Sequence, residues 1–196
     1  MRVRTEDRRQ AIIDVALGAF REFGFERTSM AVISRRLGGS KGTLYGYFRS
    51  KEDLFESAMK AAFEGPGDQI MILLDPRAAD LCKVLLRFAR AYLVFAVSPE
   101  VLSITRTAIS DGSSSSLGPH LFEHGPGRAL EKMTHYFSEV MKAGKLREGT
   151  SPKMAALHFK GLIEAGFLEE ALYGAETQSD EATSAAVDAF LRAYAA

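Results

Sequence analysis

The chain has 196 residues, of which 46% are hydrophobic and 26% charged, and its formal net charge of zero hides an uneven distribution. Residues 1–51 carry eleven Lys/Arg against five Asp/Glu, a net of +6, and residues 52–196 balance them with −6, so the N-terminal quarter is suited to a polyanion. The single cysteine, Cys82, excludes an intrachain disulfide, and neither a secretory signal nor an apolar run of about 20 residues is found, so we expect a cytoplasmic protein outside the membrane.

The first two predicted helices occupy the basic N-terminal quarter. The first begins near Thr5 and ends at Gly24, for which we expect a left-handed conformation. Its apolar residues recur at helical spacing and form one face: Ile12, Ile13, Ala16, Leu17, Phe20 and Phe23. The second helix follows Ser29, a good N-cap, and ends at Gly38-Gly39.

A third, short helix runs from Ser40 to near Phe48 and cannot be stable alone. Leu44 and Phe48 lie four residues apart and can anchor it to a core. Ser50 opens a fourth helix, because the letters SKED place an acid at the third helical position, as in a capping box. By pattern alone, the second helix, the glycine turn and the third helix form a helix-turn-helix.

The rest of the chain is expected to be helical too, because no sustained period-2 alternation is present. Prolines and glycines in residues 64–77 predict a break, with a domain boundary near Gly65, and residues 110–119 predict a mobile loop. Five more helices bring the total to about nine: Leu81–Val97, Pro99–Ser110, Pro126–Ala143, Pro152–Tyr173 and Asp180–Tyr194. The predicted fold is all-α, with a helix-turn-helix domain at 1–50, a connecting helix at 51–65 and a larger domain at 66–196.

The residues of the third helix suit contact with DNA, since the second helix of such a pair enters the major groove. Lys41 offers a cation, Gly42 lets the backbone approach closely, and Thr43 offers a hydroxyl or a methyl group. Tyr45 and Tyr47 are long enough to reach bases or phosphates. Hydroxyls, backbone N–H groups at a helix start and basic side chains nearby can bind phosphate, and they belong to Thr28, Ser29, Arg35, Arg36 and Lys51.

The alternative is that this short helix is simply packed core. Leu44 and Phe48 already suffice for that purpose, and Tyr45 and Tyr47 fall on other faces. A glycine inside a helix also costs about 1 kcal/mol relative to alanine. Packing explains neither the exposed tyrosines nor the two glycines, so the pattern favours DNA binding.

The segment FGFERTSMAVISRRLGGSKGTLYGYFRSKEDLF resembles the DNA-binding domain of the TetR family of bacterial transcriptional regulators, over roughly residues 7–58. The resemblance implies an all-α protein with three N-terminal helices for DNA and about six more for a ligand pocket and a dimer interface. It also implies groove and phosphate contacts by Thr28, Ser29, Ser40, Lys41, Gly42, Thr43, Tyr45, Tyr47 and Lys51. The expected function is a homodimeric repressor released from a palindromic operator on double-stranded DNA by an unknown small apolar or amphipathic effector.

Two positions depart from the usual pattern of that family. Gly39 stands where an apolar residue is commoner, which should loosen the turn. Gly46 stands where His, Arg or Asn is frequent, which removes one possible DNA contact. These glycines leave open a second hypothesis, an all-α module that binds a small molecule or a partner protein and reads DNA weakly; an activator is a further alternative.

Beyond residue 65 the candidate residues serve a pocket or a dimer, although plain core is the alternative for each aromatic residue. An effector pocket should be lined by apolar and aromatic residues with a few polar ones; the candidates are Phe88, Tyr92, Phe95, Arg106, Phe122, Phe137 and His158. The last two long helices are the best candidates for dimerisation, since their glycines allow close approach and their apolar residues supply a surface: Gly161, Leu162, Ala165, Leu168, Leu172, Phe190 and Leu191.

Signals for an enzyme, a metal or a cofactor are weak. The sequence has no glycine-rich phosphate loop, no nucleophile elbow and no set of Cys and His at metal-ligand spacing. His120 and His124 are four residues apart, but Gly and Pro flank them, so a metal site is not expected. We therefore expect neither catalysis nor a bound cofactor.

Overall fold

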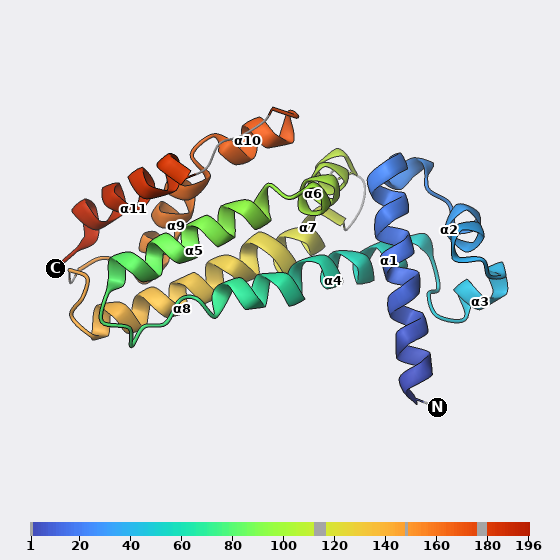
Figure 1. Cartoon of the computed structure of the whole chain (residues 1–196), viewed down its shortest axis with the longest axis horizontal. Helices are drawn as coiled ribbons and strands as arrows, with labels where there is room; N and C mark the ends of the chain where they lie inside the picture. The colour runs from blue at the N-terminus through green and yellow to red at the C-terminus, as the bar shows by residue number, and fades with distance from the viewer. Residues whose placement is uncertain (1, 112–116, 148, 176–179) are drawn as a thin grey trace. The chain divides into compact units, whose positions relative to one another are not determined.

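The computed structural model describes residues 2–111, 117–147, 149–175 and 180–196, and these residues form helices without a named β-strand (Figure 1). The predicted all-α class is confirmed. An antiparallel bridge joins Leu146 to Ala195. Residues 112–116, half of the predicted loop at 110–119, lie outside the described residues, and the described residues on either side of them belong to helices rather than to a loop. No helix of the described part has the length and hydrophobicity that crossing a membrane requires.

The chain divides into two compact units, and each combines separate stretches of sequence. The N-terminal unit comprises residues 1–64 and 99–124, and the C-terminal unit comprises residues 65–98 and 125–196. The N-terminal unit therefore includes a stretch, 99–124, that the sequence placed in the larger domain. The helix α4 (Lys51–Met71) belongs to both units, because it continues through Pro66 instead of stopping there.

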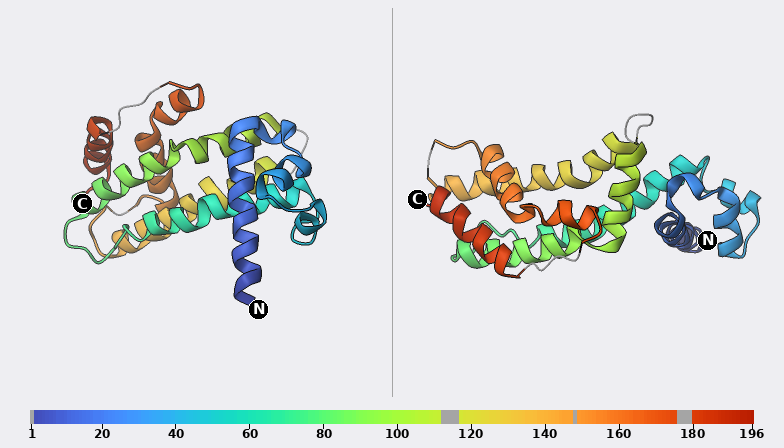
Figure 2. Two further views of the ribbon diagram at one scale, coloured as in Figure 1. Left: turned by 45° about the vertical axis from the view of Figure 1, so that its right-hand side comes forward. Right: turned by 90° about the horizontal axis from the view of Figure 1, so that it is seen from above.

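The N-terminal unit is built on α1 (Arg2–Arg27), with α2 (Met30–Leu37) and α3 (Lys41–Tyr45) beside it (Figures 1 and 2). Gly24 interrupts α1 with φ 77° and ψ 168°, so its φ is positive as expected, but its ψ is extended. Phe20, Phe25 and Phe55 form the aromatic centre of this unit, with ring centroids 4.9–5.8 Å apart. Burial of these rings fixes α4 against α1.

Two further helices complete the N-terminal unit. These are α6 (Pro99–Asp111), which packs against α1, and α7 (Leu117–Phe122), which packs against α6. The five-residue π-helix η1 (Glu123–Gly127) follows α7 without a break and contains Pro126. Proline lacks the N–H that an α-helical hydrogen bond needs, and the hydrogen-bonding pattern of η1 differs locally from that of the regular helices on either side of it.

The C-terminal unit packs around an aromatic core. Its helices are α5 (Leu81–Ala96), α8 (Arg128–Lys142), α9 (Pro152–Glu164), α10 (Phe167–Leu172) and α11 (Asp180–Tyr194). The helix α9 contacts α8 and α11, and α11 also contacts α5. The predicted single helix over Pro152–Tyr173 breaks at Gly166, whose φ of 93° is a conformation that favours glycine.

Candidate nucleic-acid interface

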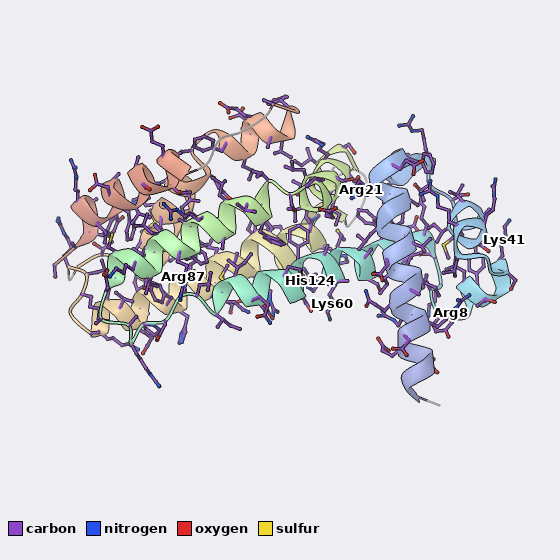
Figure 3. The ribbon with its side chains drawn as sticks, in the orientation of Figure 1. Arg8, Arg21, Lys41, Lys60, Arg87 and His124 are labelled. Carbon is purple, nitrogen blue, oxygen red and sulfur yellow. The ribbon has the colours of Figure 1, made fainter. Side chains whose placement is uncertain are left out.

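The short helix α3 is anchored on one side and open on the other. Leu44 is completely buried and Phe48 is 1% exposed, so these two side chains hold α3 in the core of the N-terminal unit. Ser40 caps its start, since Ser40 Oγ accepts the backbone N–H of Thr43 at 3.1 Å. The remaining face carries Lys41 and Tyr45, both exposed. Figure 3 labels Lys41 on this helix.

The turn between α2 and α3 is fixed by hydrogen bonds. Gly38 adopts a left-handed conformation, with φ 68° and ψ 25°, and its N–H donates to Arg35 O. Gly39 donates its N–H to Ser34 O at 3.2 Å and accepts the Ser34 hydroxyl at 2.9 Å. The loosening expected from Gly39 is thus countered by bonds to both of its backbone polar groups.

The fold itself does not require a glycine at position 42. A Cβ added there would meet only Ser40 Oγ, at 3.7 Å, which is ordinary van der Waals contact. Gly42 is also exposed. Together with Lys41 and Tyr45, it leaves a bare stretch of backbone between two long side chains, which is the arrangement that close approach to another macromolecule requires.

Replacing Gly42 by alanine separates folding from binding at this position. We expect Gly42→Ala to leave the melting temperature unchanged or raise it, because alanine favours a helix by up to about 1 kcal/mol. The same change should weaken DNA binding severalfold, because the methyl group keeps the backbone away from the groove. Thermal unfolding and a DNA titration on the same sample measure both effects. The control is Gly18→Ala on α1, where an added Cβ meets nothing within 4 Å. Equal DNA affinity of the wild type and Gly42→Ala would contradict close approach at this position.

Thr28 has a structural role that the sequence did not reveal. Its side chain is completely buried, and its hydroxyl donates to Gly24 O at 2.6 Å and lies 3.2 Å from Ala19 O. The backbone N–H of Thr28 donates to Phe25 O. The predicted phosphate contact by this hydroxyl is therefore corrected: the group closes the non-helical turn at Gly24. Ser29, in contrast, is exposed and caps α2.

The isosteric change Thr28→Val tests this role. It removes the only donor that the side chain offers to the two carbonyls, so we expect the free energy of unfolding to fall by about 1–3 kcal/mol. Chemical denaturation measures the loss. Ser29→Ala, at the exposed neighbouring position, should cost about 1 kcal/mol through the lost cap. A Thr28→Val protein as stable as the wild type would show that the buried hydroxyl contributes nothing.

The predicted basic contacts differ in how firmly they are held. Arg36 pairs with Glu22 at 2.5 Å and stacks over Phe23, with 4.7 Å between its guanidinium carbon and the ring centroid. Lys51 donates to Phe25 O at 3.0 Å and lies over the Phe25 ring. Arg35 is exposed. The geometry thus pre-positions Arg36 and Lys51, whereas Arg35 extends into solvent.

Some features of this surface escaped the sequence prediction. Arg49 is exposed directly after Phe48 and is a further candidate for a phosphate contact. In the sequence, only the basic composition of residues 1–51 pointed to it. Arg8 on α1 comes close to the turn, since its Nη2 would lie 3.3 Å from a Cβ at Gly39 (Figure 3). Tyr47 and Thr43 are half-buried, and the Thr43 hydroxyl lies 3.0 Å from Ser40 Oγ.

The predicted pocket residues do not gather in one place. Phe88, Tyr92 and Phe137 belong to the C-terminal core, where Phe88 stacks on Tyr92 and Phe137 meets Phe159 edge-on at 5.5 Å. Arg106 and Phe122 are exposed and belong to the N-terminal unit. The structure therefore does not unite these seven residues around one cavity, and their contact with an effector stays a prediction.

Two of these side chains have clear polar partners, and a third is described by its burial. The Tyr92 hydroxyl donates to Glu164 at 2.8 Å, and burial, with a contribution from that carboxylate, raises the pKa of Tyr92 well above its usual value. His158 is exposed on α9 and hydrogen-bonds to the Tyr194 hydroxyl. Phe95 is half-buried.

The expected dimer residues divide into buried and accessible groups. Phe190 is completely buried in the core of its own chain, which corrects its assignment to a surface for a partner. Gly161 and Ala165 are exposed, and Leu162, Leu168, Leu172 and Leu191 are half-buried. Sequence reasoning missed Met154 and Leu157, which are 43% and 39% exposed and share helical spacing with Gly161.

The two histidines considered for a metal make separate contacts. His120 lies 2.8 Å from a carboxylate oxygen of Glu56, and His124 lies 3.4 Å from one of Glu64. Figure 3 labels His124 near Lys60 of α4. Among the described residues, no three side chains of the types that bind metals come together.

Comparison with known proteins identifies the family. Residues 12–58 match the bacterial regulatory proteins of the tetR family, and residues 83–196 match the C-terminal domain of AefR-like transcriptional repressors. The transcriptional regulator BetI of Yersinia pestis (strain Pestoides F) is 26% identical over 175 residues, 89% of this chain and 86% of that protein. The uncharacterized regulator YhgD of Bacillus subtilis (strain 168) is 36% identical over 50 residues, which are 26% of each chain.

Solved structures agree with this identification. A TetR-family regulator from Mesorhizobium loti MAFF303099 superposes with a TM-score of 0.91 at 26% identity, covering 98% of this chain and 99% of its own. The flavonoid-responsive regulator FrrA superposes with a TM-score of 0.76 at 29% identity, covering 97% and 98%. Regulators of this family are DNA-binding transcription factors and not enzymes. The chain belongs to the TetR family of bacterial transcriptional regulators.

Proposed function

We propose that this protein is a homodimeric, ligand-responsive repressor that acts in the cytoplasm and leaves a palindromic operator when a small apolar or amphipathic molecule binds to it. The observation that carries the proposal is the two-sided helix α3, anchored through Leu44 and presenting Lys41 and Tyr45 to the outside. The match to AefR-like repressors supports repression, and the flavonoid-responsive neighbour FrrA supports control by a small molecule.

On DNA, α3 would lie in the major groove and the surrounding residues would hold the phosphates. Lys41, Thr43 and Tyr45 are the candidates for base contacts, with Gly42 allowing the backbone to come near. The candidates for phosphate contacts are the capping serines, the remaining tyrosine and the basic side chains: Ser29, Ser40, Tyr47, Arg35, Arg36 and Lys51.

The dimer would form through the outer faces of α9 and α11. These helices pack against each other, and their exposed surface includes apolar or small residues among charged ones: Met154, Leu157 and Gly161 on α9, Ala165 directly after it, and Ala185 and Ala189 on α11. Small residues let helices of two protomers approach closely, and two-fold symmetry would place the α3 helices about 34–36 Å apart, one turn of DNA.

The test is to titrate the protein onto DNA from its own promoter at two salt concentrations. If several phosphates are contacted, the logarithm of the binding constant should fall linearly with the logarithm of salt concentration, by about 0.9 for each phosphate. Competitor DNA of unrelated sequence should bind about a thousandfold or more weakly. Binding without salt dependence and without sequence preference would refute DNA recognition by the N-terminal unit.

A further inference from the structure

The C-terminal unit contains an open cleft that none of the predicted pocket residues lines. It lies between the end of α4, the segment after it, and α8, and has a volume of about 780 Å³. Sites for small molecules usually measure about 300–1,000 Å³. We call this space the α4–α8 cleft. The residues that matter for its chemistry are Asp68, Met71, Ile72, Leu74, Arg128 and Lys132.

One side of the cleft is a cluster of two cations around a single carboxylate. Arg128 Nη2 donates to both oxygens of Asp68, at 2.9 and 3.2 Å, and Lys132 Nζ donates to Oδ1 at 2.5 Å. These bonds from Lys132 and Arg128 lower the pKa of Asp68 below its usual value. All three side chains are 37–41% exposed, so solutes can reach them. The three groups together carry a charge of +1, and the exposed carboxylate of Glu131, which also lines the cleft, balances it.

The other side of the cleft is apolar and partly uncovered. Ile72 is 70% exposed, although it is a large aliphatic residue, and Met71 and the buried Leu74 lie beside it in the lining. Tyr136 of α8 closes the wall with 4% of its surface exposed. Two cations that already hold a carboxylate, next to exposed aliphatic surface, are complementary to a molecule that has an anionic group and an apolar part.

We propose that the α4–α8 cleft binds a small amphipathic carboxylate, whose anionic group replaces the Asp68 carboxylate on Arg128 and Lys132 while its apolar part covers Ile72 and Met71. Asp68 itself demonstrates that a carboxylate fits these two cations. The inference deepens the proposed function, since it rests on control by an effector and assigns that effector a chemical class and a site.

Displacement of Asp68 would have a mechanical consequence. Asp68 and Met71 belong to α4, and Arg128 and Lys132 belong to α8, so the ion cluster ties these helices together. A ligand that takes the place of Asp68 breaks that tie. The helix α4 continues from Asp68 back to Lys51, within the N-terminal unit, and is thus a covalent route from the cleft toward the DNA-binding residues.

Octanoate is a suitable probe, because it combines a carboxylate with a flexible apolar chain. Calorimetry on the full-length protein should detect octanoate binding, whereas acetate, which lacks the chain, and octyltrimethylammonium, which reverses the charge, should not bind at the same concentrations. Lys132→Gln should weaken octanoate roughly three- to tenfold, since one charged hydrogen bond is lost. Lys142→Gln is the matched control, because Lys142 also pairs with a carboxylate, that of Glu139, at 2.8 Å and on the same helix.

The decisive variant is Asp68→Asn, because competition predicts an increase in affinity. Removing the charge of Asp68 should raise the affinity for octanoate by a similar factor of about three to ten, since the ligand no longer has to displace a carboxylate from Arg128 and Lys132. Thermal unfolding checks that each variant is folded. An Asp68→Asn protein that binds octanoate no better than the wild type would overturn the proposal. An equal loss of octanoate affinity in Lys132→Gln and Lys142→Gln would overturn it as well.

The same samples separate this inference from the proposed function. Operator binding is measured for each variant with and without octanoate. If octanoate follows the expected order but operator affinity does not respond, the cleft is a ligand site and the assignment of its ligand as effector is overturned. If neither the wild type nor any variant binds DNA while the octanoate affinities follow the expected order, the proposed repressor function is refuted and the ligand site in the α4–α8 cleft is supported.

Discussion

Replacing Tyr45 by alanine will weaken operator binding about five- to 150-fold, the range that corresponds to 1–3 kcal/mol for one good base contact. Tyr45 is 52% exposed on α3, so its removal leaves no cavity, and the melting temperature should change little. The effect is thus confined to the surface that we assign to DNA. Fluorescence anisotropy with labelled promoter DNA, together with thermal unfolding, measures the two quantities.

Tyr173→Ala provides the matched control for this experiment. Tyr173 is 85% exposed and belongs to the C-terminal unit, outside the proposed interface. The Tyr173→Ala variant should therefore bind DNA with the affinity of the wild type. If both tyrosine variants lose affinity equally, or if neither does, Tyr45 has no special part in reading DNA, and the alternative of an all-α binding module gains ground.

If the proposed dimer forms through α9 and α11, introducing arginine at Gly161 will convert it to a monomer and lower operator affinity by a factor of about 100 to 10,000, because two linked half-site contacts become independent. Gly161 is exposed, and a Cβ added there meets nothing within 4 Å inside the chain, so the protomer accommodates the new side chain. Between two closely packed copies of α9, the same side chain would bring a charge into an apolar contact. Sedimentation velocity reports the oligomeric state.

Val94→Arg places the same charge at a different apolar position. Val94 is 61% exposed on α5, a helix that is not part of the surface assigned to the dimer. The expected result is an intact dimer with normal DNA binding. A Val94→Arg monomer combined with a Gly161→Arg dimer would move the interface to α5 and refute the assignment to α9 and α11.

The DNA-binding head could be predicted because its determinants are local in sequence. Ser29 and Ser40 cap the helices they precede, Gly38 takes the positive φ that ends α2, and the four-residue spacing of Leu44 and Phe48 gives the anchored face of α3. Each of these effects acts within a few residues. Thr28 was misjudged because its hydroxyl bonds to carbonyls at positions 19 and 24, which a reading of neighbouring residues does not bring together.

The C-terminal unit could be predicted only as a set of helices. Helical spacing identifies an apolar face, but it does not show whether that face packs in the core of the chain or stays exposed. Phe190 and Leu157 both occur in apolar helical patterns, yet Phe190 is completely buried and Leu157 is 39% exposed. The α4–α8 cleft joins Asp68 to residues about 60 positions away, and the sequence alone gave no sign of that pairing. The burial of Phe190, the exposure of Leu157 and the pairing of Asp68 all depend on packing between segments that are far apart in the sequence.

The glycine at position 46 makes operator preference easy to change. Gly46 has φ −70° and ψ −20°, which any residue can adopt, and the nearest group to an added Cβ is the Thr43 carbonyl oxygen of the same turn, at 3.3 Å. A side chain there requires an adjustment of only a few tenths of an ångström. If α3 binds the operator as proposed, a single substitution at position 46 would add a side chain to the DNA-facing helix without rebuilding the N-terminal unit, and so change which operators the protein prefers.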